Sequence, residues 1–213
     1  MSKSQAIDIY LSNMEIVKSR LRYSEGQLNV FKKAKNYMLL ENAILHTRKA
    51  LECIAYASIA PNKKAYAKFR SEAGTPADFR KDYHGGKILK QLEKINKEFY
   101  PLPLMVPKLM EPKKWHYDRL NGGYLTKNQF IKFYDRLGKY LHADNPWDND
   151  KGYLNLAKDL PDYFSKIKAL LQTHATFVQD AKSRYAFIIN MGSEKKTVSV
   201  VTGIAEGEFN VRT

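Results

Sequence analysis

Residues 28–59 read LNVFKKAKNYMLLENAILHTRKALECIAYASI, and this stretch decides the fold class. Its apolar residues recur at intervals of three and four, which places them on one side of a helix. Pro61 lies just beyond the stretch and predicts its end, because a proline disfavours helical backbone in the residue before it. The inner side of this predicted helix consists of Phe31, Ala34, Met38, Ile44, Leu45, Leu51, Ile54 and Ala55.

The segments on either side of this stretch also carry helical patterns. Further helices are expected over 4–23, 63–72, 77–82 and 86–98. Ser24, Glu25 and Gly26 predict a break after the first of them, although a helix that continues through these residues stays open. Residues 101–112 contain four prolines and predict an extended, wrapping loop.

The helix predicted over 126–143 has the clearest boundaries. Thr126 is followed three positions later by Gln129, which is the pattern of a capping box. Pro146 lies just beyond the other end. A final helix is expected over 152–181, within which Pro161 either kinks the helix or begins a new one.

The C-terminal residues change from a helical period to an alternating one. Residues 185–190 and 197–201 predict two strands joined by a turn, and 208–212 add a third, short strand. So few strands are not stable alone and must pack on the helices or on a partner. We therefore expect a mainly α protein with a short C-terminal antiparallel β-hairpin or three-stranded ribbon.

The chain is strongly basic, with 36 Lys and Arg against 22 Asp and Glu and a formal net charge of +14. Such a surplus attracts polyanions and favours contacts with phosphate groups. Residues 61–120 hold half of it, so this part of the chain is expected to supply much of a binding face. The alternative is that the lysines serve solubility alone.

Several classes of protein are excluded by composition. Cys53 is the only cysteine, which rules out an internal disulfide and fits a reducing cytoplasm. A zinc site is not expected, because there is no second cysteine and the histidines are scattered. No apolar run approaches the roughly 20 residues of a membrane span, and no phosphate-binding glycine loop is present. We expect a cytoplasmic protein without membrane association, metal or cofactor.

The candidate catalytic residues lie in FYDRLGKYLHADNPW, residues 133–147. His142 has a side chain whose pKa suits a general base, and Arg136 can bind a phosphate and stabilise the charge that develops on it. Together they suit metal-independent cleavage of RNA by its own 2′-hydroxyl. Positions six apart lie about 120° apart on a helix. The two side chains therefore converge only if the helix end relaxes or a second surface completes the site.

RNA-binding residues are predicted beside this motif and in the segment KKWHYDRL, residues 113–120. Basic residues interleaved with aromatic ones can hold the backbone while stacking on bases. The alternative is that Trp115 and Tyr117 plug the end of the bundle beneath the proline-rich loop. The predicted RNA contacts are Lys113, Lys114, Trp115, Lys139, Tyr140 and Asn145.

Other polar residues have structural interpretations. Arg48 and Glu52 are four positions apart on a predicted helix and are expected to form an ion pair. His84 lies in a basic loop flanked by glycines, which is either a phosphate contact or a turn. His174 falls near the inner side of the last predicted helix and is expected to be a hydrogen-bonded core residue.

The chain resembles the HEPN superfamily of helical nucleotide-binding proteins. The resemblance rests on Arg136 and His142 followed by Ala143-Asp144-Asn145-Pro146, and on the helical segment ENAILHTRKALECIAYASI, residues 41–59. It covers residues 28–180, implies a helical bundle and leaves the C-terminal strands unexplained. Together with the alternating pattern at the C-terminus, it leads us to expect a helical bundle over residues 1–183, with 184–213 as a β-appendage packed on the bundle or on a partner. It also implies an endoribonuclease that works as a homodimer in a toxin or phage-defence context, with an antitoxin or defence-system protein as a further partner.

One position departs from the family pattern. Leu137 follows the arginine where many active members carry a polar residue. This departure favours the alternative of a non-catalytic module that binds RNA, a nucleotide or another protein. A third alternative is a helical scaffold that recruits a partner through an exposed strand edge.

Overall fold

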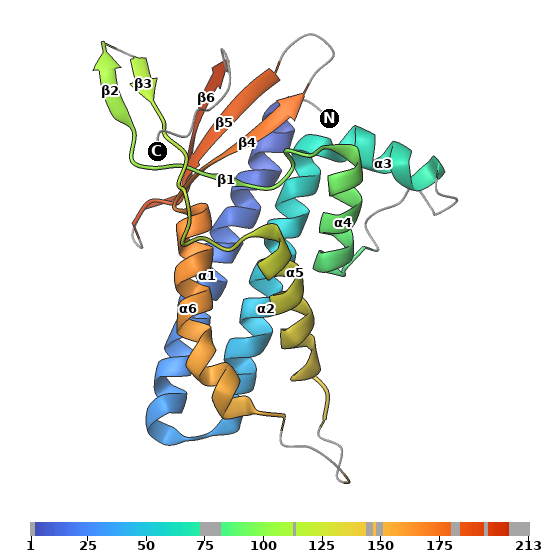
Figure 1. Ribbon diagram of the computed structural model, residues 1–213, viewed down its shortest axis with the longest axis vertical. Coiled ribbons are helices and arrows are strands. Elements are labelled where there is room, and N and C mark those ends of the chain that lie inside the picture. Colours follow the sequence, from blue (N-terminus) through green and yellow to red (C-terminus); the bar gives the residue numbers. More distant parts are fainter. Residues whose placement is uncertain are drawn as a thin grey trace.

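The computed structural model describes residues 3–72, 82–112, 114–143, 147, 151–179, 184–193 and 196–204. It shows a mainly helical protein with a small antiparallel sheet, as the sequence predicts at this level. The long helices stand side by side, and the sheet crosses one end of them (Figure 1).

Helices α1 (Lys3–Ala34) and α2 (Tyr37–Ile59) form an antiparallel pair. The expected helix over 28–59 is therefore wrong, because the chain reverses at Lys35 and Asn36. Lys35 adopts a positive φ of 56°, and the Asn36 side chain accepts a hydrogen bond from the amide of Met38. The break predicted at 24–26 is absent, and the open alternative of a continuous helix is the one observed.

In the described part of the chain, four further α-helices follow α2. A short 3₁₀ turn (Ala60–Asn62) leads into the first, and the Thr126–Gln129 capping box of α5 is present as predicted. α5 ends four residues before the predicted end at 143. Of the short helix expected over 77–82, residues 77–81 lie outside the described residues. The helices are α3 (Lys63–Glu72), α4 (Gly85–Ile95), α5 (Lys127–Lys139) and α6 (Tyr153–Leu171).

The helix predicted to run to residue 181 ends ten residues earlier, at Leu171. Residues 173–179 form strand β4 (Thr173–Gln179). THATFVQ contains β-branched and aromatic residues, which favour strands, and it pairs with two neighbouring strands in the sheet. Pro161 neither restarts the helix nor ends it, since α6 continues through it.

The main sheet has four antiparallel strands in the order β1-β4-β5-β6. β5 (Arg184–Asn190) and β6 (Ser199–Ile204) match the predicted hairpin. β1 (Leu102–Pro103) and β4 precede residue 184, so the sheet draws on segments that were expected to be loop and helix. The third strand predicted at 208–212 lies outside the described residues.

A separate two-stranded ribbon begins in the segment expected to be a wrapping loop, residues 101–112, and ends just beyond it. It consists of β2 (Lys108–Glu111) and β3 (Lys114–His116), and Figure 1 shows it projecting beside the sheet. Within the described residues, none of the helices combines the length and apolarity that a bilayer crossing requires.

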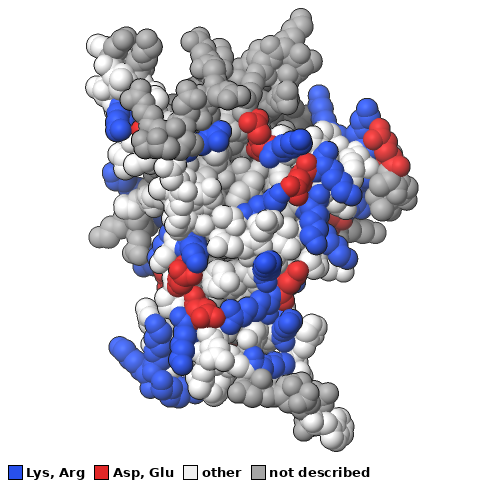
Figure 2. Space-filling model, in the orientation of Figure 1, with Lys and Arg blue, Asp and Glu red and all other residues white. Residues whose placement is uncertain are grey.

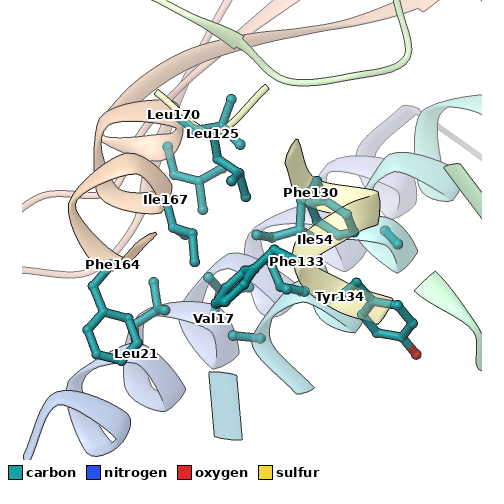
Figure 3. Close-up of a cluster of buried hydrophobic side chains, with 14 of the residues drawn as sticks. Val17, Leu21, Ile54, Leu125, Phe130, Phe133, Tyr134, Phe164, Ile167 and Leu170 are labelled. Carbon is teal, nitrogen blue, oxygen red and sulfur yellow. The ribbon is translucent and has the colours of Figure 1, made fainter. Parts of the chain in front are cut away.

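The hydrophobic core lies between α1, α2, α5 and α6 (Figure 3). Aromatic rings from α5 fill its centre, and Phe133 stacks on Tyr163 of α6 with 3.6 Å between ring centroids. The side chains labelled in Figure 3 are Val17, Leu21, Ile54, Leu125, Phe130, Phe133, Tyr134, Phe164, Ile167 and Leu170. This packing fixes α5, the helix that carries Arg136.

Candidate functional site

Helix α5 is held against α2 by Arg48. The Arg48 guanidinium lies 3.8 Å from the centroid of the Tyr134 ring, and its Nη1 donates to the Tyr134 carbonyl at 2.7 Å. The Tyr134 hydroxyl donates to a Glu52 carboxylate oxygen at 2.8 Å. Arg48 Nε lies 3.6 Å from the same oxygen, so the ion pair predicted between Arg48 and Glu52 is present. Burial and then the hydrogen bond to Glu52 raise the pKa of Tyr134, which keeps the phenol protonated as a donor.

Gly138 makes this contact between α2 and α5 sterically possible. A Cβ atom at this position would lie 2.7 Å from Arg48 Nη1, which is too close for two non-bonded heavy atoms. The missing side chain therefore lets the guanidinium lie directly against the backbone of α5.

Arg136 projects from α5 toward α6. Its Nη1 lies 2.7 Å from a carboxylate oxygen of Asp159, and its side chain also forms a hydrogen bond with Tyr140. Partial burial lowers the pKa of Arg136, but the hydrogen bonds with Asp159 and Tyr140 outweigh it, so the pKa lies above the ordinary value of arginine. One third of the side chain remains exposed, at 33%. Arg136 is thus a fixed cation that solvent can still reach.

His142 lies on the segment that follows α5, and it is exposed. Its backbone carbonyl accepts a hydrogen bond from Lys151 Nζ, which ties the segment to the residues just before α6. Arg136 is paired with Asp159 instead of with His142. The structure therefore places the two predicted catalytic residues at the same end of the molecule without a direct contact between them.

Two neighbours of the motif are core residues. Leu137 is completely buried. Tyr140, predicted to contact RNA, is only 7% exposed, and its ring packs against that of Tyr153 with 5.1 Å between centroids. The prediction that Tyr140 contacts RNA is therefore wrong, because its side chain is buried and lies against Arg136. Lys139 is exposed, and Asn145 lies outside the described residues.

The remaining predicted RNA contacts lie on the β2–β3 ribbon. Trp115 is 55% exposed on β3, opposite Leu109 of β2, so it does not plug the end of the bundle. Lys114 lies in β3, and Lys113 falls outside the described residues. Figure 1 shows this ribbon at the opposite end of the molecule from the C-terminal end of α5. The structure therefore separates Trp115 from the Arg136–His142 motif.

A basic group that sequence reasoning did not single out lies at the motif's own end of the molecule. It surrounds the connection between α1 and α2, at the lower left of Figures 1 and 2. Its exposed members are Lys32, Lys33 and Lys35. The sequence KKAK at 32–35 carries the signal, but the prediction of one continuous helix over 28–59 concealed that these lysines surround a chain reversal. A second basic face follows α3 and α4, at the right of Figure 2, in the part of the chain that holds half of the charge surplus.

His84 and His116 each form a local polar contact. His84 caps α4, since its Nδ1 accepts a hydrogen bond from the amide of Lys87 at 3.2 Å. His116 lies 2.9 Å from Asp118. These contacts favour the interpretation of His84 as part of a turn.

His174 is the core histidine that the sequence predicts, although it lies in β4 and not in a helix. It is completely buried between the Tyr10 hydroxyl and the Leu171 carbonyl, each 2.8 Å from one ring nitrogen. Because the carbonyl can only accept, Nδ1 carries the proton and Nε2 accepts from Tyr10. Burial lowers the pKa of His174 to about 4, so the ring is neutral at pH 7.

Within the described part of the chain, no three His, Cys, Asp or Glu side chains are grouped so that they could hold a metal ion. Comparison with protein-family models, with curated proteins and with solved structures gave no match.

Proposed function

We propose that this protein is a metal-independent endoribonuclease in which His142 and Arg136 act on one phosphodiester. The observation that carries the proposal is the position of both side chains at one basic end of the molecule. His142 is exposed, and Arg136 is partly exposed and held in place by Asp159. The basic residues at the same end are Lys32, Lys33 and Lys35. Lysines so placed can hold an RNA backbone beside the two candidate catalytic groups.

The proposed reaction uses groups that this chain supplies. The His142 imidazole takes the proton of the 2′-hydroxyl, and the 2′-oxygen attacks the adjacent phosphorus. Arg136 stabilises the extra negative charge on the phosphate oxygens. The 5′-oxygen leaves and takes a proton from the His142 imidazolium or from water, which gives a 2′,3′-cyclic phosphate and a 5′-hydroxyl. A guanidinium has five N–H donors, so Arg136 can keep its bond to Asp159 while other donors meet the phosphate.

The proposal includes a homodimer, as the resemblance to HEPN proteins implies. Large apolar side chains are exposed at this end of the molecule, and a second copy would cover them. Such a pairing would bring two Arg136–His142 motifs into one cleft and remove the need for contact within one chain. An antitoxin or defence-system protein would regulate the same surface. The exposed apolar residues are Met38, Leu141, Trp147 and Leu154.

The test is cleavage of labelled RNA in the presence of EDTA. We expect cleavage by the unmodified protein, with Arg136→Ala and His142→Ala inactive and circular dichroism unchanged. His46→Ala and Arg22→Ala serve as matched controls, because both residues lie on the α1–α2 pair and neither contacts the motif, and both variants should stay active. Cleavage that persists in the Arg136 or His142 variant would refute the assignment.

A second candidate function is RNA binding without cleavage. The observation in its favour is the ion pair between Arg136 and Asp159. The carboxylate accepts a hydrogen bond from the guanidinium and offsets its charge. Binding with a steep salt dependence but without products would select this function. Asp159→Asn separates the two candidates. It should raise RNA affinity under either function, but it should raise the cleavage rate only if Arg136 takes part in the reaction.

A further inference from the structure

A cavity of about 620 Å³ opens between α1, the C-terminal end of α6 and the β5–β6 connection. It is separate from the Arg136–His142 motif, which lies at the other end of α6 (Figure 1). A volume of this size suits a small organic ligand. Its floor is apolar and is formed by the buried side chains of Leu21, Leu171 and Met191.

One lysine holds the wall formed by the described residues of the β5–β6 connection, 191–193 and 196–198. Lys18 Nζ donates to the carbonyls of Met191 and Ser193 at 2.8 and 2.7 Å and to that of Lys196. These bonds use all three of its N–H groups. The Glu15 carboxylate accepts from the Val198 amide, which attaches the far side of the connection to α1. The cavity is therefore shaped before any ligand arrives, which lowers the cost of binding.

Charge around the cavity favours an anion. The lining contains four cations, Lys18, Arg22, Lys168 and Lys196, and two carboxylates, Glu15 and Glu25, which leaves a balance of +2. Lys168 is paired with Glu25 at 2.5 Å, and Lys18 is occupied by carbonyls. Arg22 and Lys196 are exposed, and neither has a carboxylate partner among the described residues.

We propose that this cavity binds a small phosphate ester. The dianionic phosphate would be held by Arg22 and Lys196, and an apolar organic part would lie on Leu21, Leu171 and Met191. Hydroxyl groups on the lining can donate further hydrogen bonds to the phosphate oxygens. A phosphate dianion matches the balance of +2 better than a carboxylate, whose single charge leaves one cation unmatched. The lining hydroxyls belong to Ser19, Ser193 and Thr197.

The experiment uses four probes that separate the charge from the apolar part: phenyl phosphate, benzoate, benzyl alcohol and inorganic phosphate. Isothermal titration should give a submillimolar Kd for phenyl phosphate and at least tenfold weaker binding for the other three. Phenyl phosphate should also raise Tm, because it binds only the folded state. Benzoate binding as tightly as phenyl phosphate would identify the natural ligand class as carboxylates and overturn the phosphate assignment.

Two variants locate the binding. Arg22→Gln combined with Lys196→Gln should weaken phenyl phosphate at least tenfold, while Lys90→Gln, an exposed lysine on α4, should leave its Kd unchanged. Ser19→Trp places a bulky ring in the cavity from an exposed position of α1 and should abolish binding with the Tm of the free protein retained.

Unchanged affinity in both variants, or no binding of phenyl phosphate by the unmodified protein at millimolar concentration, would refute the site. RNA cleavage depends on the other end of the molecule and should be the same in all of these variants. The two proposals can therefore fail independently.

Discussion

Replacing Gly138 by alanine should destabilise the protein, although alanine is the better helix former. An alanine Cβ would lie 2.7 Å from Arg48 Nη1, so the guanidinium must withdraw from α5. The withdrawal breaks the bond from Arg48 to the Tyr134 carbonyl and the stacking on the Tyr134 ring. Hydrogen bonds from charged groups contribute about 1.5–3 kcal/mol, and a partly exposed cation–π contact about 0.5–1 kcal/mol.

Alanine is a better helix former than glycine by up to about 1 kcal/mol, and by less near a helix end, which offsets part of this loss. We therefore expect Gly138→Ala to lower the free energy of unfolding by about 1–3 kcal/mol. In an Arg48→Ala background the obstructing guanidinium is absent, and the same substitution should instead stabilise the protein slightly. The sign of the effect of Gly138→Ala thus depends on residue 48.

Urea unfolding followed by circular dichroism measures all four proteins of this double-mutant cycle. The coupling between the two positions should be about 2–4 kcal/mol, because both the hydrogen bond from Arg48 and its cation–π interaction are broken. Equal effects of Gly138→Ala in both backgrounds would show that Arg48 does not anchor α5 against α2.

Three further predictions concern stability. Because the folded-state pKa of His174 is about 4 and the unfolded value about 6.5, the unfolded chain binds more protons between these values. The contribution of His174 to the free energy of unfolding is therefore fully present above about pH 6.5, and this free energy should fall by about 2 kcal/mol between pH 7 and 5. His174→Asn should flatten this pH dependence, and His116→Asn should not. Lys35→Gly should raise Tm and the free energy of unfolding by up to about 1 kcal/mol, because φ is 56° there; an unchanged or lower Tm would contradict this. Thr126→Ala should lower the urea midpoint by the equivalent of about 1 kcal/mol, since it removes the capping box of α5, and a wild-type midpoint would show that the cap is dispensable.

Local patterns predicted those parts of the fold that local chemistry determines. The capping box at Thr126 begins a helix because two side chains and two amides satisfy one another within four residues. The reversal at Lys35 escaped prediction because a lysine with positive φ is uncommon, and the flanking residues are compatible with a helix on either side.

Long-range contacts decided the elements that the sequence did not reveal. Residues 173–179 fit the end of a helix by apolar spacing, yet they pair with β5 and with β1, a segment about 70 residues earlier. Their backbone N–H and C=O groups find hydrogen-bond partners in an extended conformation only through this pairing. The contact between Arg136 and Asp159 joins two helices in the same way, and spacing within one helix could not predict it.

The burial of Leu137 bears on whether the candidate site is active. The proposed function draws on a resemblance to HEPN proteins, and many active HEPN members carry a polar residue directly after the arginine. In this fold that position is completely buried in the core between α5 and its neighbours, and an unpaired polar side chain there would cost about 1–3 kcal/mol. Leucine at 137 is therefore explained by packing, without any reference to catalysis. The proposed ribonuclease activity requires instead that the guanidinium of Arg136 bind a phosphate while it is paired with Asp159, so Asp159 is the residue at which the proposal is best tested.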